Sequence, residues 1–139
     1  MRGVSHGDIK SSNILVTSWN WVYVTDFATT YKPTYLPLND PADFAFYFDT
    51  SGKRTCYVAP ERFYDAHQKD RDRDDPHHKR KEQPVLESMD VFGAGCVLAE
   101  LWLDGEAVFT LSSMFKYRSG EPVLDHYFDR ISEPVVRVS

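Results

Sequence analysis

Short apolar runs around a polar turn mark the N-terminal part of the chain. Residues 14–17 and 21–25 are rich in β-branched and aromatic side chains, and Ser18-Trp19-Asn20 separates them. Two such runs joined by a short polar link are typical of a β-hairpin. We therefore predict a small antiparallel hairpin between residues 14 and 25.

Longer apolar patterns mark the C-terminal part. Residues 89–102 are apolar at nearly every helical position, as expected for a helix that is buried on every side. Two weaker helical patterns follow over residues 111–117 and 123–131, and Ser119-Gly120-Glu121-Pro122 breaks the chain between them. The predicted fold class is mainly α with a small β-hairpin.

The middle of the chain holds two stretches of opposite character. Residues 31–49 carry three prolines among six aromatic side chains, which favours a segment packed on the rest of the fold. This segment is either a fixed platform for a substrate or partner or simply locally packed chain. Residues 65–87 contain many charges of both signs without apolar periodicity, which is typical of a disordered, solvated insertion.

The stretch from His6 to Asn13, just before the first strand, carries the candidate chemistry. A carboxylate, an ammonium two residues later and an amide five residues later suit phosphoryl transfer. Asp8 can take the proton of an attacking hydroxyl, Lys10 can neutralise charge on the phosphoryl group, and Asn13 can hold Mg²⁺. The hairpin would return a second carboxylate, Asp26, to Asn13, so that both could bind one metal ion.

Composition narrows the functional class. The chain has 139 residues, a hydrophobic fraction of 42% and a net charge of −5, so it can form a packed core, and its acidic balance argues against nucleic-acid binding. Two cysteines provide no disulfide framework, which favours a reducing compartment and a cytoplasmic location. The longest apolar run, residues 91–99, is too short to span a bilayer.

These motifs resemble the catalytic core of eukaryotic-type protein kinases. Their H-R-D-L-K-x-x-N loop is met at His6, Asp8, Lys10 and Asn13, their D-F-G at Asp26 and Phe27, and their A-P-E at Ala59, Pro60 and Glu61. The resemblance implies a partial protein-kinase fold over residues 1–139, belonging to the C-terminal (large) lobe, with ATP and Mg²⁺ as cofactors. Because no Gly-rich phosphate loop precedes the catalytic loop in this sequence, we expect the isolated chain to bind ATP weakly and to be inactive.

The same resemblance implies structural roles for His6, Glu61 and Asp90. Asp90, at the start of the apolar helix, is expected to accept hydrogen bonds from the backbone near His6 and Gly7. Glu61 corresponds to a glutamate that pairs with an arginine of a late helix in kinases, and that arginine is expected beyond Ser139.

Two positions depart from the kinase pattern. Gly7 replaces an arginine that pairs with a phosphate on the activation segment in most protein kinases, so phosphorylation of that segment is not expected to be the switch. Ala28 replaces the glycine of D-F-G. This change either penalises a backbone flip that would move Asp26 out of the site, or reflects a site no longer used for chemistry.

A narrower resemblance is to the kinase-like regulatory subunit of the class III phosphatidylinositol 3-kinase complex, the vacuolar-protein-sorting serine/threonine kinase family. It is carried by His6-Gly7-Asp8-Ile9-Lys10, by Thr25-Asp26-Phe27-Ala28 and by Lys32-Pro33-Thr34-Tyr35-Leu36-Pro37. The similarity runs over residues 4–62 and resumes at Met89.

That family implies partners and a location. The expected partners are the catalytic subunit of the class III phosphatidylinositol 3-kinase and its accessory subunits, acting in endosomal and vacuolar sorting and in autophagy. The family also implies a lipid-anchored parent protein on endosomal, vacuolar and autophagic membranes. This chain begins Met1-Arg2-Gly3 and lacks the Met-Gly start that N-myristoylation requires, so membrane contact is expected only through the parent protein's anchor.

Three functions remain open at this point. The first is a serine/threonine protein kinase, and the second is a catalytically weak pseudokinase scaffold in which the nucleotide has a structural role. The third is a small-molecule phosphotransferase of the aminoglycoside or choline kinase type, where H-G-D-x-x-x-x-N also occurs. Lys10, the Asp26-Phe27 pair and the A-P-E motif all argue against the third.

Overall fold

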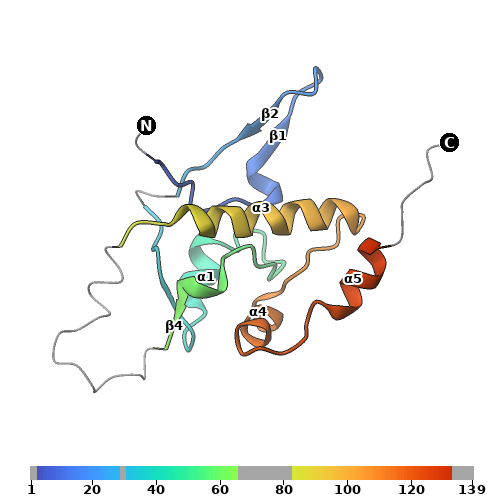
Figure 1. Ribbon diagram of the computed structural model, residues 1–139. Helices are drawn as coiled ribbons and strands as arrows, with labels where there is room; N and C mark the ends of the chain where they lie inside the picture. Colours follow the sequence, from blue (N-terminus) through green and yellow to red (C-terminus); the bar gives the residue numbers. More distant parts are fainter. Residues whose placement is uncertain (1–2, 29–30, 66–82, 133–139) are drawn as a thin grey trace.

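Helix α3 (Glu87–Trp102) lies across the centre of the molecule, and the other elements are arranged around it (Figure 1). The structure is a computed structural model that describes residues 3–28, 31–65 and 83–132. Before α3, the chain forms the 3₁₀ turn η1 (Ser11–Asn13), strands β1 (Ile14–Val16), β2 (Val22–Val24) and β3 (Leu36–Pro37), helix α1 (Ala42–Tyr47), the 3₁₀ turn η2 (Pro60–Arg62) and strand β4 (Phe63–Tyr64). After α3 come helices α4 (Leu111–Arg118) and α5 (Asp125–Ser132). Among the regular elements of the described residues, helices therefore predominate, and there are two small sheets.

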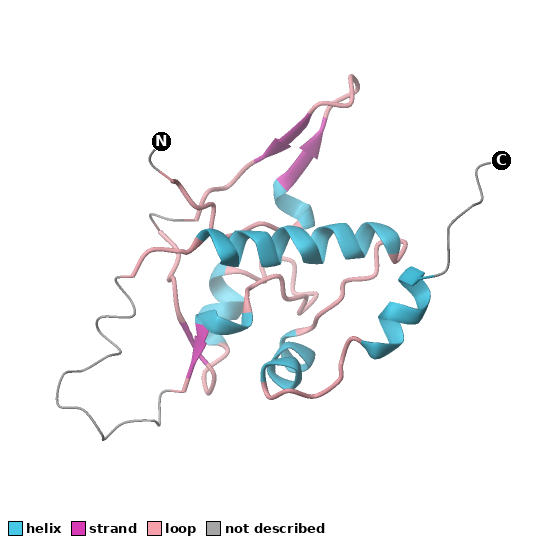
Figure 2. Cartoon of the chain, in the orientation of Figure 1, coloured by secondary structure: helices cyan, strands magenta, loops and turns pink. Residues whose placement is uncertain are grey.

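The predicted hairpin is confirmed. Strands β1 and β2 pair antiparallel, with Ile14 opposite Val24 and Val16 opposite Val22. The turn closes through a 2.9 Å hydrogen bond from the Thr17 amide to the carbonyl of Trp21. Both strands are shorter than the apolar runs that predicted them, and the hairpin extends away from α3 (Figure 2).

The helices after α3 are also confirmed, with bounds shifted by one or two residues. Helix α4 begins after Thr110, whose side chain accepts a hydrogen bond from the backbone amide of Ser113 while the Ser113 hydroxyl accepts one from the Thr110 amide. This reciprocal capping box satisfies amide donors that a helix start otherwise leaves unpaired. Such a cap fixes where the helix begins.

The aromatic segment over residues 31–49 is packed rather than free, as predicted. Leu36, Phe44 and Phe48 are all buried. The segment also contributes strand β3, which pairs in parallel with β4 and places Leu36 opposite Phe63. This second sheet was not predicted from the sequence. The charged insertion predicted over residues 65–87 falls largely on residues 66–82, which lie outside the described residues.

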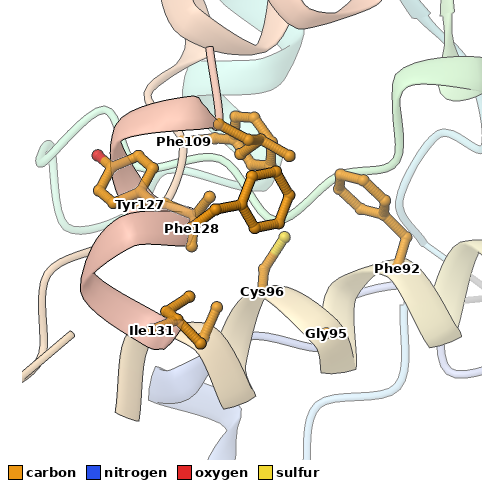
Figure 3. Close-up of a pocket in the computed structure, with 10 residues that line it drawn as sticks. Phe92, Gly95, Cys96, Phe109, Tyr127, Phe128 and Ile131 are labelled. Atoms are coloured by element: carbon orange, nitrogen blue, oxygen red, sulfur yellow. The ribbon is translucent and has the colours of Figure 1, made fainter. Parts of the chain in front are cut away.

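The main hydrophobic core lies between α3 and the segments that contain α1 and α4. Its buried members come from many parts of the chain: Leu36, Phe44, Phe48, Cys56, Val58, Phe63, Cys96, Leu103, Val108, Phe109 and Met114. An apolar pocket of about 200 Å³ lies beside this core, between α3 and α5. There Phe128 and Ile131 of α5 lie close to Cys96 of α3 (Figure 3).

Within the described chain, helix α3 is buried on one side only, and the prediction of burial on every side is wrong. Met89 and Cys96 are buried, whereas Val91 and Leu101 are 70% and 69% exposed. An apolar sequence allows a helix to be buried all round, but burial also requires neighbouring elements on every side. Among the helices that the structure describes, none combines the length and apolar character of a membrane span.

Candidate phosphoryl-transfer site

The loop that carries Asp8 is anchored to the first turn of α3. The amide of His6 donates to Asp90 Oδ2 at 2.5 Å, and the amide of Gly7 donates to Asp90 Oδ1 at 2.8 Å. Gly7 has a φ of 83°, a left-handed conformation that glycine adopts without steric cost. The hydrogen bonds predicted for Asp90 are therefore present, and they fix the backbone just before Asp8.

Helix α3 also contacts this loop through Gly93. A Cβ atom at that position would lie 2.9 Å from the carbonyl oxygen of Ile9. Glycine is thus needed for the close approach of helix and loop, in agreement with the helix-packing role that its place in an apolar helix suggests.

His6 joins the loop to the segment that carries Asp26. Its Nδ1 accepts a hydrogen bond from the Asp8 amide at 3.2 Å, and its Nε2 lies 2.7 Å from the carbonyl oxygen of Thr25. These contacts fit a neutral ring with the proton on Nε2. The ring also packs on Phe27, with the ring centroids 4.4 Å apart. One imidazole therefore contacts the backbone of Asp8 and that of Thr25, the residue before Asp26.

The carboxylate of Asp8 is buried, and three nitrogen atoms lie close to one of its oxygens: two donate hydrogen bonds, and that of Lys10 forms an ion pair. Its Oδ2 lies 2.5 Å from Lys32 Nζ, 3.1 Å from Asn13 Nδ2 and 3.3 Å from Lys10 Nζ. The side chain is 3% exposed, so solvent screens these interactions little. The structure thus brings together Asp8, Lys10 and Asn13, as predicted, and adds a second ammonium from Lys32.

Both lysines are held by further contacts with aromatic residues of the following segment. Lys10 donates to the carbonyl oxygen of Phe48 at 3.1 Å. The Lys32 ammonium lies 5.3 Å from the centroid of the Phe48 ring and 5.6 Å from that of Tyr31, within the range of a cation–π interaction. Sequence reasoning missed Lys32 as a site residue, because no motif spacing relates it to Asp8.

Asp26 lies at the edge of the site. The Thr25 amide donates to the carbonyl oxygen of Asn13 at 2.8 Å, which places Asp26 next to the end of the loop of residues 6–13. Asp26 is exposed, makes no hydrogen bond with a described residue, and has a left-handed φ of 62°. Such strained conformations of non-glycine residues occur often at functional sites.

The chemistry of Asn13 and Asp26 fits a magnesium ion. The amide nitrogen of Asn13 is engaged by Asp8, which leaves its oxygen available, and oxygen atoms are the ligands that Mg²⁺ prefers. No group of three or more His, Cys, Asp or Glu side chains among the described residues could hold a metal ion. Mg²⁺ would therefore need water or phosphate oxygens to complete its shell, as it does in nucleotide sites.

Glu61 does not share the buried environment of the other matched residues. It lies in η2 and is exposed, and it forms no ion pair with a described residue. The arginine partner is expected beyond Ser139, so the pairing of Glu61 stays a prediction. The neighbouring Arg62, which sequence reasoning did not single out, is buried instead, with 3% of its surface exposed.

Comparison with known proteins identifies long, similar sequences. No protein-family model matches the chain. The chain is 45% identical over 136 residues to "Serine/threonine-protein kinase VPS15" of Arabidopsis thaliana, a match that covers 98% of this chain and 9% of the relative. It is 54% identical over 120 residues to "Probable serine/threonine-protein kinase vps15" of Dictyostelium discoideum, covering 86% and 6%. It is 50% identical over 116 residues to the protein named VPS15 in Saccharomyces cerevisiae, covering 84% and 8%. The chain thus spans less than a tenth of the length of these relatives.

Proposed function

Because this chain belongs, as a short segment, to the VPS15 family of serine/threonine-protein kinases, we propose that it forms the phosphoryl-transfer half of a protein kinase site. In this proposal residues 1–139 are part of the large lobe of a kinase domain. The observation that carries the proposal is the buried Asp8 carboxylate with Lys10 and Asn13 on its Oδ2.

Each residue has a defined role in this proposal. Asp8 accepts the proton of a serine or threonine hydroxyl, and Lys10 neutralises charge that develops on the transferred phosphoryl group. Asn13 and Asp26 hold Mg²⁺ through their oxygen atoms. When bound, the ion would offset negative charge on the phosphates of ATP. Asp90 and His6 keep the loop in place but do not touch the reacting groups.

The direct test is phosphate transfer by the full-length protein. Asp8→Asn removes the base, and Asp26→Asn weakens the metal site. Each should reduce transfer from ATP by at least about a hundredfold, the scale on which a general base contributes. Asp43→Asn is the matched control, since Asp43 is an exposed acid in the first turn of α1. Full activity of Asp8→Asn would refute the proposed base.

A second candidate function is supported by the ion pair between Lys32 and Asp8. Lys32 Nζ is paired with Asp8 Oδ2, so one oxygen of the proposed base is already engaged. A site held in this way suits a regulatory scaffold that binds a nucleotide without using it. In this alternative the protein organises the lipid-kinase subunit of the class III phosphatidylinositol 3-kinase complex on endosomal and autophagic membranes.

The two functions predict different responses to the same variants. If nucleotide binding has a structural role, Asp8→Asn should leave complex assembly and lipid-kinase output largely intact, because Asp8 contributes little to holding the nucleotide. Asp26→Asn should loosen the nucleotide and the assembly together. The measurements are lipid-kinase output and pull-down of the catalytic lipid-kinase subunit. Equal and complete loss in both variants, with the fold intact by circular dichroism, favours the working kinase.

A further inference from the structure

The guanidinium of Arg62 joins three segments of the chain. Its Nη1 donates to the carbonyl oxygen of Gly7 at 2.6 Å, its Nε to that of Thr34 at 2.7 Å, and its Nη2 to that of Pro33 at 3.1 Å. The group also lies 4.9 Å from the centroid of the Phe48 ring. Arg62 itself belongs to η2, so the catalytic loop, the Pro33-Thr34 stretch and η2 meet at one side chain.

This cation has no carboxylate in direct contact among the described residues. Burial lowers the pKa of Arg62, and the negative charges of Asp8 and Asp90 act in the opposite direction and raise it. A buried charge is costly unless hydrogen bonds and nearby opposite charges compensate for it. Here three backbone carbonyls and two acids of the site supply that compensation, so the position of Arg62 depends on the site being assembled.

Two of the three residues that Arg62 holds are direct neighbours of the residues of an ion pair. Pro33 follows Lys32, and Gly7 precedes Asp8. Lys32 Nζ and Asp8 Oδ2 are 2.5 Å apart. One guanidinium therefore fixes the backbone next to the cation and the backbone next to the anion.

We propose that Arg62 is a positioning residue that holds Lys32 on Asp8 and keeps the segment after Asp26 docked on the catalytic loop without a phosphate. This inference rests on the proposed function, because it takes Asp8 as the centre of the site. Gly7 cannot pair with a phosphorylated activation segment. Arg62 links the same two regions through backbone carbonyls instead, so the link needs no modification.

An arginine is required because the link needs several donors in a fixed arrangement. The guanidinium has five N–H donors in a planar fork, whereas a lysine ammonium is a single flexible point of charge. Arg62→Lys should therefore retain the charge but lose part of the bridge, and Arg62→Gln should lose both.

The reactivity of Lys32 in the full-length protein tests this role independently of catalysis. Amine acylation at each lysine is followed by mass spectrometry under native conditions. The Lys32 side chain is 9% exposed and paired with Asp8, so the wild-type protein should protect it. Arg62→Gln should raise its acylation rate by about tenfold, the factor that corresponds to losing one hydrogen bond to a charged group. Arg62→Lys should give an intermediate rise.

Two controls separate positioning from general stability. Arg118→Gln removes an exposed arginine that donates to the carbonyl oxygen of Pro60 at 3.2 Å, and it should leave the reactivity of Lys32 unchanged. Met114→Ala removes a fully buried side chain of α4, and it should lower the melting temperature without exposing Lys32. If Arg62→Gln does not fold, Arg62→Lys carries the comparison.

Either of two results would overturn the inference. One is a wild-type acylation rate at Lys32 in both folded Arg62 variants. The other is an equal increase in Met114→Ala at a matched loss of melting temperature, which would show that any destabilisation exposes Lys32. If the proposed function is wrong, the result is different: Asp8→Asn would keep phosphate transfer, while Arg62→Gln would still raise the acylation rate of Lys32. Arg62→Gln combined with Asp8→Asn should add little to the exposure that Asp8→Asn causes by itself.

Discussion

Removal of the Asp90 carboxylate should detach the catalytic loop from α3. Asp90 accepts hydrogen bonds from the amides of His6 and Gly7 at 2.5 and 2.8 Å. A hydrogen bond to a charged group contributes about 1.5–3 kcal/mol, so two contribute about 3–6 kcal/mol at most. Both are only partly buried, and water can partly replace the acceptor. We therefore expect Asp90→Ala to lower the free energy of unfolding by about 2–4 kcal/mol.

Urea unfolding followed by circular dichroism measures this loss as a shift of the midpoint at constant slope. Asp90→Asn should cost about half as much, because the amide keeps one acceptor oxygen but turns its NH₂ group toward the other backbone donor. Glu87→Ala is the matched control. Glu87 is also acidic and in the first turn of α3, but it is exposed, so its loss removes only a weak interaction with the helix dipole.

The comparison of Asp90→Ala with Glu87→Ala tests whether Asp90 holds the loop. Equal changes for Asp90→Ala and Glu87→Ala, both within about 0.5 kcal/mol of wild type, are the values expected of ordinary surface positions. That result would falsify the claim that Asp90 holds the loop. A lower slope instead of a shifted midpoint would indicate that the variant changes the cooperativity of unfolding rather than its free energy.

Three further predictions concern other parts of the fold. Gly95→Ala should stabilise the chain by about 1 kcal/mol in urea unfolding, because glycine is unfavourable inside a helix and a Cβ there meets nothing within 4 Å. Gly93→Ala should instead destabilise the chain by about 1–2 kcal/mol, because a Cβ there would crowd Ile9. Both cysteine thiols have their pKa raised to about 12 by burial, so neither should react with iodoacetamide near pH 8 before unfolding. The hydrogen bond from Arg130 lowers the pKa of Glu106. Its contribution to stability is therefore complete above the ordinary carboxyl pKa and lost as the pH falls through the lowered value; Arg130→Gln should bring the Glu106 pKa, measured by NMR, back toward the ordinary 4.5.

Local patterns account for the parts of the fold that could be predicted from the sequence. The β1–β2 hairpin follows from two apolar runs around a polar turn, because strand, turn and strand are contiguous. Helices α4 and α5 follow from their periodicity. The contact of Asp90 with the loop joins residues far apart in the sequence. It could be predicted because the resemblance to protein kinases covers both Asp90 and the loop. The parallel pairing of β3 with β4 had no such signal, since two-residue strands are too short to carry a pattern.

Some residues of the candidate site could be predicted from the sequence, and others could not. Asp8, Lys10 and Asn13 lie within six residues of one another, and a motif identified all three. Lys32 and Arg62 reach the site only through tertiary folding: Lys32 belongs to a stretch that indicated the family but no role in the site, and Arg62 looks like an ordinary charged residue. For α3 the sequence predicted more burial than the structure shows. Composition indicates how apolar a helix is, but it does not show which elements pack against it.

The position of Lys32 gives the two proposed functions a common physical basis. For Asp8 to act as a base, a carboxylate oxygen must be free to take a hydroxyl proton, and in this structure Lys32 is bound to Oδ2. Bound ATP would offer Lys32 an alternative partner, because its phosphates carry more negative charge than one carboxylate. In a working kinase, Lys32 would have to leave Asp8 Oδ2 so that this oxygen could take the hydroxyl proton. In a scaffold, Arg62 would keep the Lys32 backbone in place and the ion pair would persist with nucleotide bound. The protection of Lys32 with and without Mg-ATP therefore distinguishes an acid that is released for catalysis from one that remains paired.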